Sequence, residues 1–207
     1  MNLFHPDNPV MRFLSCLFDL ILLNLLFILS CIPVVTIGAA LSAMYQVLFK
    51  IIDKKDPYIF KGYVKAFKEN FKLATLLWIL IALIGICISV ALSGIYNMIG
   101  QGYEFLQILV WILTFIVAAV AVYAFPLLSR YQCGIVQLLK NAFVLSITNI
   151  PVTVIIIVFP LGLLYIASTV GLNIAAICCI TATIGCSGIL YLISYVLFQI
   201  FKKYEDK

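Results

Sequence analysis

The sequence predicts an all-α membrane protein, and three observations support this fold class. Hydrophobic residues make up 65% of the 207 residues and charged residues only 10%, whereas an ordinary soluble domain has about 45–50% and about 25%. The mean hydropathy is +1.21. The apolar runs are continuous and long enough for spanning helices, which need roughly 20 residues, while strands of an outer-membrane barrel would alternate apolar with polar residues. We therefore expect the bilayer to be the solvent for most of the chain.

About six transmembrane helices, five long and one short, can be placed along a single integral membrane domain. They pair into an N-terminal hairpin at residues 13–52, a second hairpin at 73–129 and a third at 143–201. The short helix is the second one, which is rich in glycine and alanine. The six segments expected are residues 13–35, 36–52, 73–99, 105–129, 143–168 and 173–201. We expect the first segment to be retained, because it exceeds the 7–15 apolar residues of a signal peptide and no basic cluster precedes it.

The lysine and arginine residues predict the orientation of these segments. They gather between the second and third segments, between the fourth and fifth (Arg130 and Lys140) and near residue 207, but are absent at 100–104 and 170–172. By the positive-inside rule the basic connections are cytoplasmic, which places both termini in the cytoplasm if the number of spans is even. At 17 residues, however, the second segment barely covers ~25 Å. If it is re-entrant instead, the N-terminus lies outside.

A basic amphipathic helix is predicted at residues 57–72, in the cytoplasmic interface. Apolar and aromatic side chains recur at helical spacing on one face and lysines on another. One interpretation is a lipid-facing anchor whose lysines meet anionic headgroups, each contributing ~1 kcal/mol. The other is a docking helix for a cytoplasmic partner such as a transporter ATPase. The residues that carry both interpretations are Phe60, Tyr63, Phe67, Lys61, Lys65, Lys68 and Lys72.

Asp19 is the one carboxylate inside an apolar run. A charge at this depth is costly, so it should face protein and find a partner. A structural ion pair or helix-end hydrogen bond would account for it. The functional interpretation is a proton or cation site with Asn24 one turn deeper, and a third possibility is that Asp19 reaches water at the interface.

The second segment has the composition of a packing helix with a tight turn before it. Pro33, Thr36 and Gly38 mark the turn, and Gly38 and Ser42 form a small-xxx-small pair. Such pairs let helix backbones approach closely in a bilayer.

No pattern in the sequence indicates chemistry. There is no nucleophile–base pair, no phosphate-binding glycine loop and no metal-ligand cluster, and the seven cysteines form no CxxC pair. We therefore expect no catalytic residue, no metal, no cofactor and no nucleic-acid partner.

Four stretches resemble the YesL family of small bacterial membrane proteins. They are Asn8–Phe13, Asp19–Leu26, Ile32–Ala40 with its Pro-x-x-Thr-Ile-Gly-Ala turn, and Ala66–Lys72. The resemblance covers about residues 8–78. It implies a polytopic protein of the plasma membrane, mostly found in Gram-positive species, whose genes tend to lie beside those of carbohydrate-uptake ABC transporters. It brings no catalytic or ligand residues with it.

The resemblance implies an accessory component that associates with the permease or ATPase of a carbohydrate-uptake ABC transporter. The alternative is an autonomous transporter or channel for a small solute or ion, motivated by Asp19 and by the similarity of residues 68–74 to residues 140–146. Neither the substrate nor the oligomeric state follows from the sequence.

Overall fold

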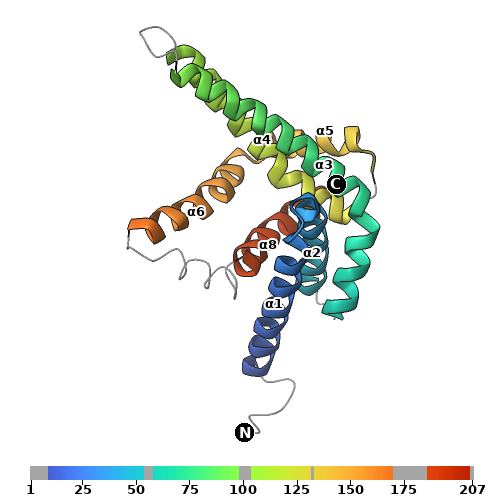
Figure 1. Ribbon diagram of the computed structural model, residues 1–207. Helices are drawn as coiled ribbons and strands as arrows, with labels where there is room; N and C mark the ends of the chain where they lie inside the picture. Colours follow the sequence, from blue (N-terminus) through green and yellow to red (C-terminus); the bar gives the residue numbers. More distant parts are fainter. Residues whose placement is uncertain (1–8, 54–57, 98–103, 132, 170–185, 206–207) are drawn as a thin grey trace.

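The computed structural model describes residues 9–53, 58–97, 104–131, 133–169 and 186–205, and these residues are helical almost throughout. The predicted all-α class is therefore confirmed (Figure 1). In chain order the elements are α1 (Pro9–Cys31), the 3-10 turn η1 (Val34–Thr36), α2 (Ile37–Ile52), α3 (Ile59–Asn97), α4 (Glu104–Arg130), α5 (Ile135–Thr148), α6 (Ile150–Thr169) and α8 (Cys186–Glu205).

Several of these helices are long and apolar enough to cross a membrane, which supports a multi-pass membrane protein. Among the described residues four stretches meet this standard: Leu14–Cys31, Val34–Ile52, Ile59–Gly94 and Phe105–Arg130. A fifth is reached if the bent pair of α5 and α6 is one span. The expected count of six is not confirmed, and the first half of the sixth segment, residues 173–185, lies outside the described residues.

The interfacial helix and the third segment, expected as separate elements, form one continuous helix. α3 has 39 residues, which at 1.5 Å per residue is about 58 Å, roughly twice the ~30 Å hydrocarbon core. The sequence between Tyr63 and Ile84 contains neither glycine nor proline, so no residue there interrupts the helix.

The fifth segment is divided into two helices at Pro151, where proline predicts a kink or break. α5 ends at Thr148, and the chain bends by 94° before α6 begins at Ile150. Pro151 explains the position of the break, because proline lacks an N–H and disfavours the helical conformation of the residue before it. Proline also predicts a kink or break at Pro126 and Pro160, but both residues lie inside helices, α4 and α6, that continue through them.

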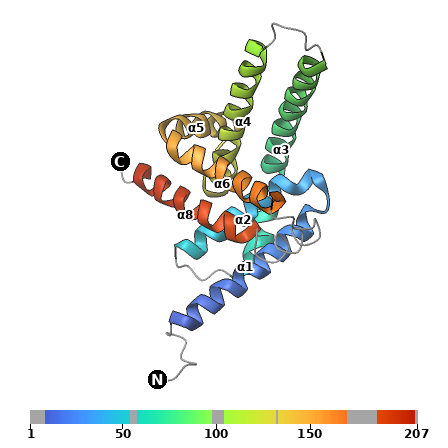
Figure 2. The ribbon, with the colours of Figure 1, turned by 90° about the vertical axis from the view of Figure 1, so that its left-hand side faces the viewer.

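α2 is the central element of the described structure. Ten of its 16 residues are buried, and it contacts α1, α3, α4 and α8. The second half of α3 and the first half of α4 extend away from this centre as a two-helix arm, which both views show (Figures 1 and 2). The arm exposes large apolar side chains such as Leu83, Val90 and Trp111, as expected for a surface that faces lipid.

The α1–α2 hairpin packs beside the first half of α3 and not beside the arm. Its tip is positioned by Gly38, whose Cα lies so close to α3 that an added Cβ would collide with the carbonyl oxygen of Ala74 and lie 2.6 Å from Cβ of Trp78. Trp78 is six residues after Lys72, roughly 9 Å along the helix axis. The tip therefore reaches only a short distance past the lysine-bearing part of α3.

Candidate functional site

The first four turns of α3 present the predicted lysines on an exposed face. Lys61, Lys65, Lys68 and Lys72 are all exposed, and the side chain of Lys65 is 74% exposed. Its Nζ lies 3.9 Å from an oxygen of Glu69 one turn later, a surface pair that contributes little to stability. We call these four lysines the basic face.

The opposite side of the same helix is fixed against protein. Ile59, Tyr63 and Ala66 are buried in a cluster with residues of α1 and α2. These partners are Leu23, Ala43, Met44, Val47 and Leu48. The helix that carries the basic face is therefore ordered by burial of its apolar side within the protein.

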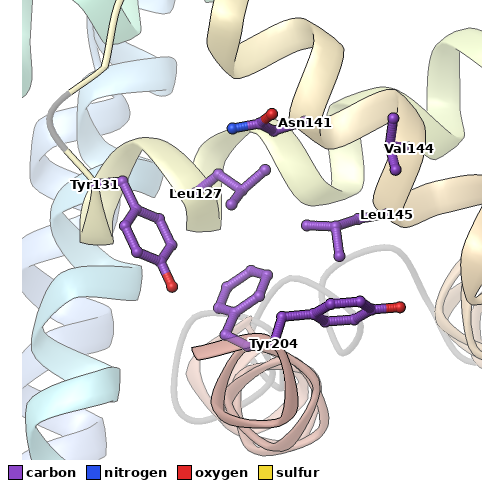
Figure 3. A pocket seen from close by; sticks show the side chains of 7 residues that line it. Leu127, Tyr131, Asn141, Val144, Leu145 and Tyr204 are labelled. Carbon is purple, nitrogen blue, oxygen red and sulfur yellow. The ribbon is translucent and has the colours of Figure 1, made fainter. Parts of the chain in front are cut away.

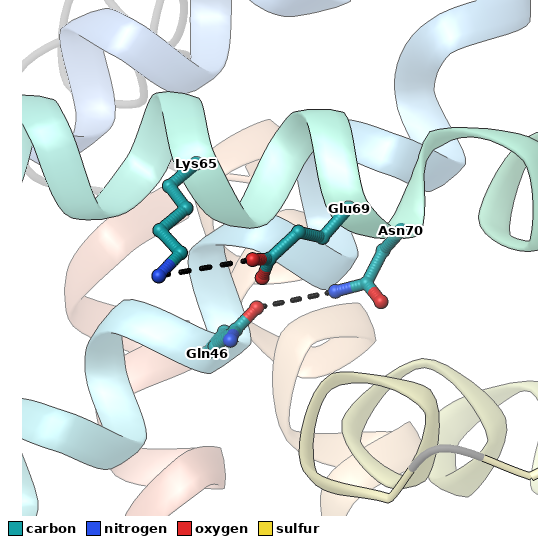
Figure 4. Close-up of polar contacts among 4 residues, drawn as sticks. All are labelled: Gln46, Lys65, Glu69 and Asn70. Atoms are coloured by element: carbon teal, nitrogen blue, oxygen red, sulfur yellow. Dashed lines mark hydrogen bonds and ion pairs between the residues drawn. The ribbon is translucent and has the colours of Figure 1, made fainter.

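One polar contact also joins α3 to α2 at this level. The amide nitrogen of Asn70 donates to Oε1 of Gln46 over 3.1 Å, as Figure 4 shows beside the Lys65–Glu69 pair. Because the carbonyl end of Gln46 accepts this hydrogen bond, its NH₂ group is directed to other partners. Asn70 is one of the positions that coincide with the YesL pattern, and its contact to α2 gives it a structural role.

The aromatic residues predicted to share one lipid-facing or partner-facing side lie in different environments. Tyr63 is only 2% exposed and faces α1 and α2, and Phe67 packs partly against the same buried residues. Phe60 is 60% exposed. The periodicity identified an apolar face, of which α1 and α2 cover Tyr63 and part of Phe67 while Phe60 and Phe71 remain exposed.

The predicted turn and packing residues are found at the tip of the hairpin and along α2. The hydroxyl of Thr36 lies 2.6 Å from the carbonyl oxygen of Ser30 and 2.7 Å from that of Pro33, and thereby bridges the end of α1 and η1. Gly38 makes the close approach to α3, and Ser42 is fully buried one turn later.

Asp19 and Asn24 lie on α1 in different environments. Asp19 is half-buried, whereas Asn24 is fully buried beside Leu23 in the contact with α2. The structure thus places the amide, and not the carboxylate, at the more enclosed position.

Arg130, at the end of α4, lies at a second polar centre that sequence reasoning did not select as a site. Three aromatic rings surround its guanidinium: the centroids of Phe198, Tyr131 and Phe201 lie 5.0, 5.9 and 6.0 Å from Cζ. These are cation–π distances. The sequence signals this centre only by an arginine at the end of an apolar helix, followed by tyrosine. The two phenylalanines come from α8, so their proximity to Arg130 cannot be read from the neighbouring sequence.

Two hollows have Arg130 in their lining, and both are also lined by Gln46 and Ser129. One, of about 290 Å³, adds Lys50, Asp53, Phe49 and Phe198. The other, of about 440 Å³, adds Asn70, Glu69, Tyr131, Leu73, Leu128, Cys133 and Gly134. The hydrogen-bond donors that line these hollows include the guanidinium of Arg130, the ammonium of Lys50 and the NH₂ of Gln46.

A third hollow, of about 420 Å³, lies next to these and is mainly apolar. Figure 3 shows Leu127, Leu145 and Val144 on its walls, with the ring of Tyr131 at the left and that of Tyr204 below. Asn141 and Phe201 complete the lining. Tyr131 and Phe201 belong both to this hollow and to the aromatic surroundings of Arg130.

The described parts of the chain contain no cluster of side chains suited to binding a metal ion. No group of three or more histidine, cysteine, aspartate or glutamate residues there could hold a metal ion. Cys133 lies in the turn between α4 and α5, and burial raises the pKa of its thiol, which lowers its reactivity at neutral pH.

Comparison with known proteins gives one finding. A family model described as "Protein of unknown function, DUF624" matches residues 20–92, the stretch that holds the second half of α1, all of α2 and α3 up to Leu92. No curated protein and no solved structure matches the chain.

Proposed function

We propose that this protein is an accessory subunit of the bacterial plasma membrane that binds a component of a carbohydrate-uptake ABC transporter through the basic face of α3. The observation that carries the proposal is the arrangement of α3: four lysines point away from a helix whose other side is fixed against α1 and α2. Such a surface is ordered before binding, so association does not have to order it.

A protein partner accounts for this arrangement better than lipid alone. A helix that serves only as a membrane anchor buries its own apolar face in the acyl region. In α3 the apolar side chains of Ile59, Tyr63 and Ala66 are covered by other helices, so the helix does not depend on the bilayer to bury them. The lysines would attract an acidic partner and would also tolerate anionic headgroups beside it.

The identity of the partner rests on the resemblance to the YesL family. YesL proteins are members of the family whose model matches residues 20–92, and the neighbourhood of their genes points to sugar import. The proposal includes no catalytic step and no cofactor.

We further propose that both termini are cytoplasmic and that the α1–α2 hairpin stays in the cytoplasmic half of the bilayer. Gly38 contacts α3 roughly 9 Å beyond Lys72, and α2 runs back from there along the lysine-bearing turns. If the basic face marks the cytoplasmic interface, the tip of the hairpin turns inside the membrane. Both α1 and α2, and not only the second segment, would then enter the membrane from the cytoplasmic side and return to it without crossing.

The autonomous transporter is less well supported. The hollow within the arm, about 300 Å³, is lined by Ile81, Ile88, Val117 and Ala118 together with Gly85, Leu92, Ala121 and the hydroxyl residues Ser89 and Thr114. The described polar hollows lie instead around the end of α4. A solute path would need polar groups along the arm.

Charge reversal tests the accessory role. Lys61, Lys65 and Lys68 are changed together to Glu, and the tagged protein is crosslinked gently in native membranes and purified in mild detergent. We expect an ABC permease or ATPase to be recovered at near-stoichiometric amounts with the wild type and to be lost with the variant. The control changes Lys140, Lys202 and Lys203 to Glu, which are exposed on α5 and α8, and should retain the partner. Equal recovery from both variants, or recovery of the protein alone from the wild type, would refute the proposal.

A further inference from the structure

The hollows around Arg130 form a composite surface with a cationic and an apolar part. The cationic part contains Lys50 and Arg130 with the NH₂ group of Gln46, and the apolar part contains Leu127, Val144 and Leu145. The two hollows share no lining residue, but Tyr131 and Phe201 of the apolar hollow lie beside the guanidinium of the cationic one, with ring centroids 5.9 and 6.0 Å from its Cζ.

We propose that this surface binds one anionic phospholipid, with the headgroup phosphate beside Lys50 and Arg130 and an acyl chain in the apolar hollow. This inference is independent of the proposed partner of α3.

The charge and hydrogen-bonding groups of the cationic hollow favour an anion. Lys50 and Arg130 carry two positive charges in this hollow against the one carboxylate of Asp53, which is exposed at the end of α2. The second hollow at Arg130 adds the carboxylate of Glu69, which lies 3.9 Å from the ammonium of Lys65. Phosphate oxygens accept hydrogen bonds from ammonium, guanidinium and amide groups alike. Basic pockets between membrane helices on the cytoplasmic side are the usual sites for anionic headgroups.

The place of the site in the fold matches the level of lipid headgroups. Lys50 is in the last turn of α2 and Arg130 in the last turn of α4, each at the end of an apolar stretch. Tyr131 and Tyr204 stand around the adjoining hollow, and tyrosine is enriched where acyl chains meet headgroups. At about 420 Å³ the apolar hollow has room for part of one acyl chain.

The arginine is held in position by its aromatic neighbours. The ring of Phe198 lies 5.0 Å from Cζ of Arg130 and is itself part of the cationic hollow. The guanidinium is therefore held beside two rings that line the apolar hollow, so a lipid whose phosphate binds Arg130 would lead an acyl chain past Tyr131 and Phe201.

Native mass spectrometry of the purified protein in detergent tests the assignment. Phosphatidylglycerol is titrated against phosphatidylcholine with the same acyl chains, and glycerol phosphate serves as the soluble probe. We expect one phosphatidylglycerol to bind preferentially. The Lys50→Gln variant should weaken that binding about fivefold, since a lysine at the surface contributes about 1 kcal/mol. Lys140→Gln, an exposed lysine outside the lining, should bind like the wild type.

A second variant separates lipid from free phosphate. Val144→Trp places a large ring in the apolar hollow from a side chain that is 59% exposed, and it should reduce phosphatidylglycerol binding while the melting temperature without lipid stays near that of the wild type. The proposal is overturned if phosphatidylcholine binds equally well, or if Lys50→Gln and Lys140→Gln have the same effect. Glycerol phosphate that binds as tightly as the lipid would show that free phosphate is the ligand and would overturn the lipid assignment.

Discussion

Replacing Gly38 by alanine should loosen the contact that aligns the α1–α2 hairpin with α3. The new Cβ would collide with the carbonyl oxygen of Ala74, which belongs to the helix backbone, and would lie 2.6 Å from Cβ of Trp78. Neither neighbour is the flexible end of a side chain. The two helices must therefore separate, or the hairpin must shift along α3.

The expected loss of stability is that of overpacking a tight interface, about 1–3 kcal/mol. For a chain of this length each kcal/mol lowers the melting temperature by about 2–4 °C. We would measure thermal unfolding of the purified protein in mild detergent and compare Gly38→Ala with Gly85→Ala. Gly85 is a helical glycine of α3 with no atom within 4 Å of an added Cβ, so its replacement reports the intrinsic preference of a helix for alanine.

Gly38→Ala should melt below Gly85→Ala by roughly 2–12 °C on this reasoning. Equal melting temperatures for the two variants would show that α2 does not approach α3 closely at Gly38. The register of the hairpin, and the proposed position of its tip, would then be wrong.

Three further predictions concern α4, the turn after it and the hairpin. Thr153→Val should lower the free energy of unfolding by about 1–3 kcal/mol in the same thermal assay, because the hydroxyl of the fully buried Tyr123 loses its partner at 3.1 Å. Thr148→Val, a control at an exposed position, should destabilise the protein less. A smaller loss for Thr153→Val than for Thr148→Val would refute the contact. In a variant that keeps Cys133 alone, alkylation should be slower at pH 7 than for a free thiol and should rise with pH, because burial raises the pKa and only the thiolate reacts; a rate at pH 7 equal to that of a free thiol would contradict this. In a cysteine-free background, Val34→Cys at the hairpin tip should not react with a membrane-impermeant maleimide added outside intact cells, whereas Phe105→Cys at the arm tip should react. Labelling of Val34→Cys from outside would mean that the hairpin crosses the membrane.

The sequence predicts well those features that depend on neighbours along the chain. Helical spacing identified Lys61, Lys65, Lys68 and Lys72 as one face, and the structure places all four on the exposed side of α3. Glycine among small residues indicated close packing at residue 38, where α2 meets α3.

Features that depend on distant partners did not follow from periodicity. The spacing of Tyr63 and Phe67 defines an apolar face but does not say whether lipid or α2 covers it. Arg130 was unremarkable because its aromatic neighbours Phe198 and Phe201 come from α8. The break expected at Pro151 is found between α5 and α6, but its angle of 94° did not follow from the sequence.

Site-specific crosslinking from the basic face tests the central claim most directly. A photoreactive amino acid is placed at position 65, and in a second protein at position 140, and both are irradiated in native membranes before purification. The accessory role of α3 predicts a crosslink from position 65 to an ABC permease or ATPase in near-stoichiometric yield, and none to either from position 140. Crosslinks from position 65 to lipid only, or to the same proteins as from position 140, would contradict it.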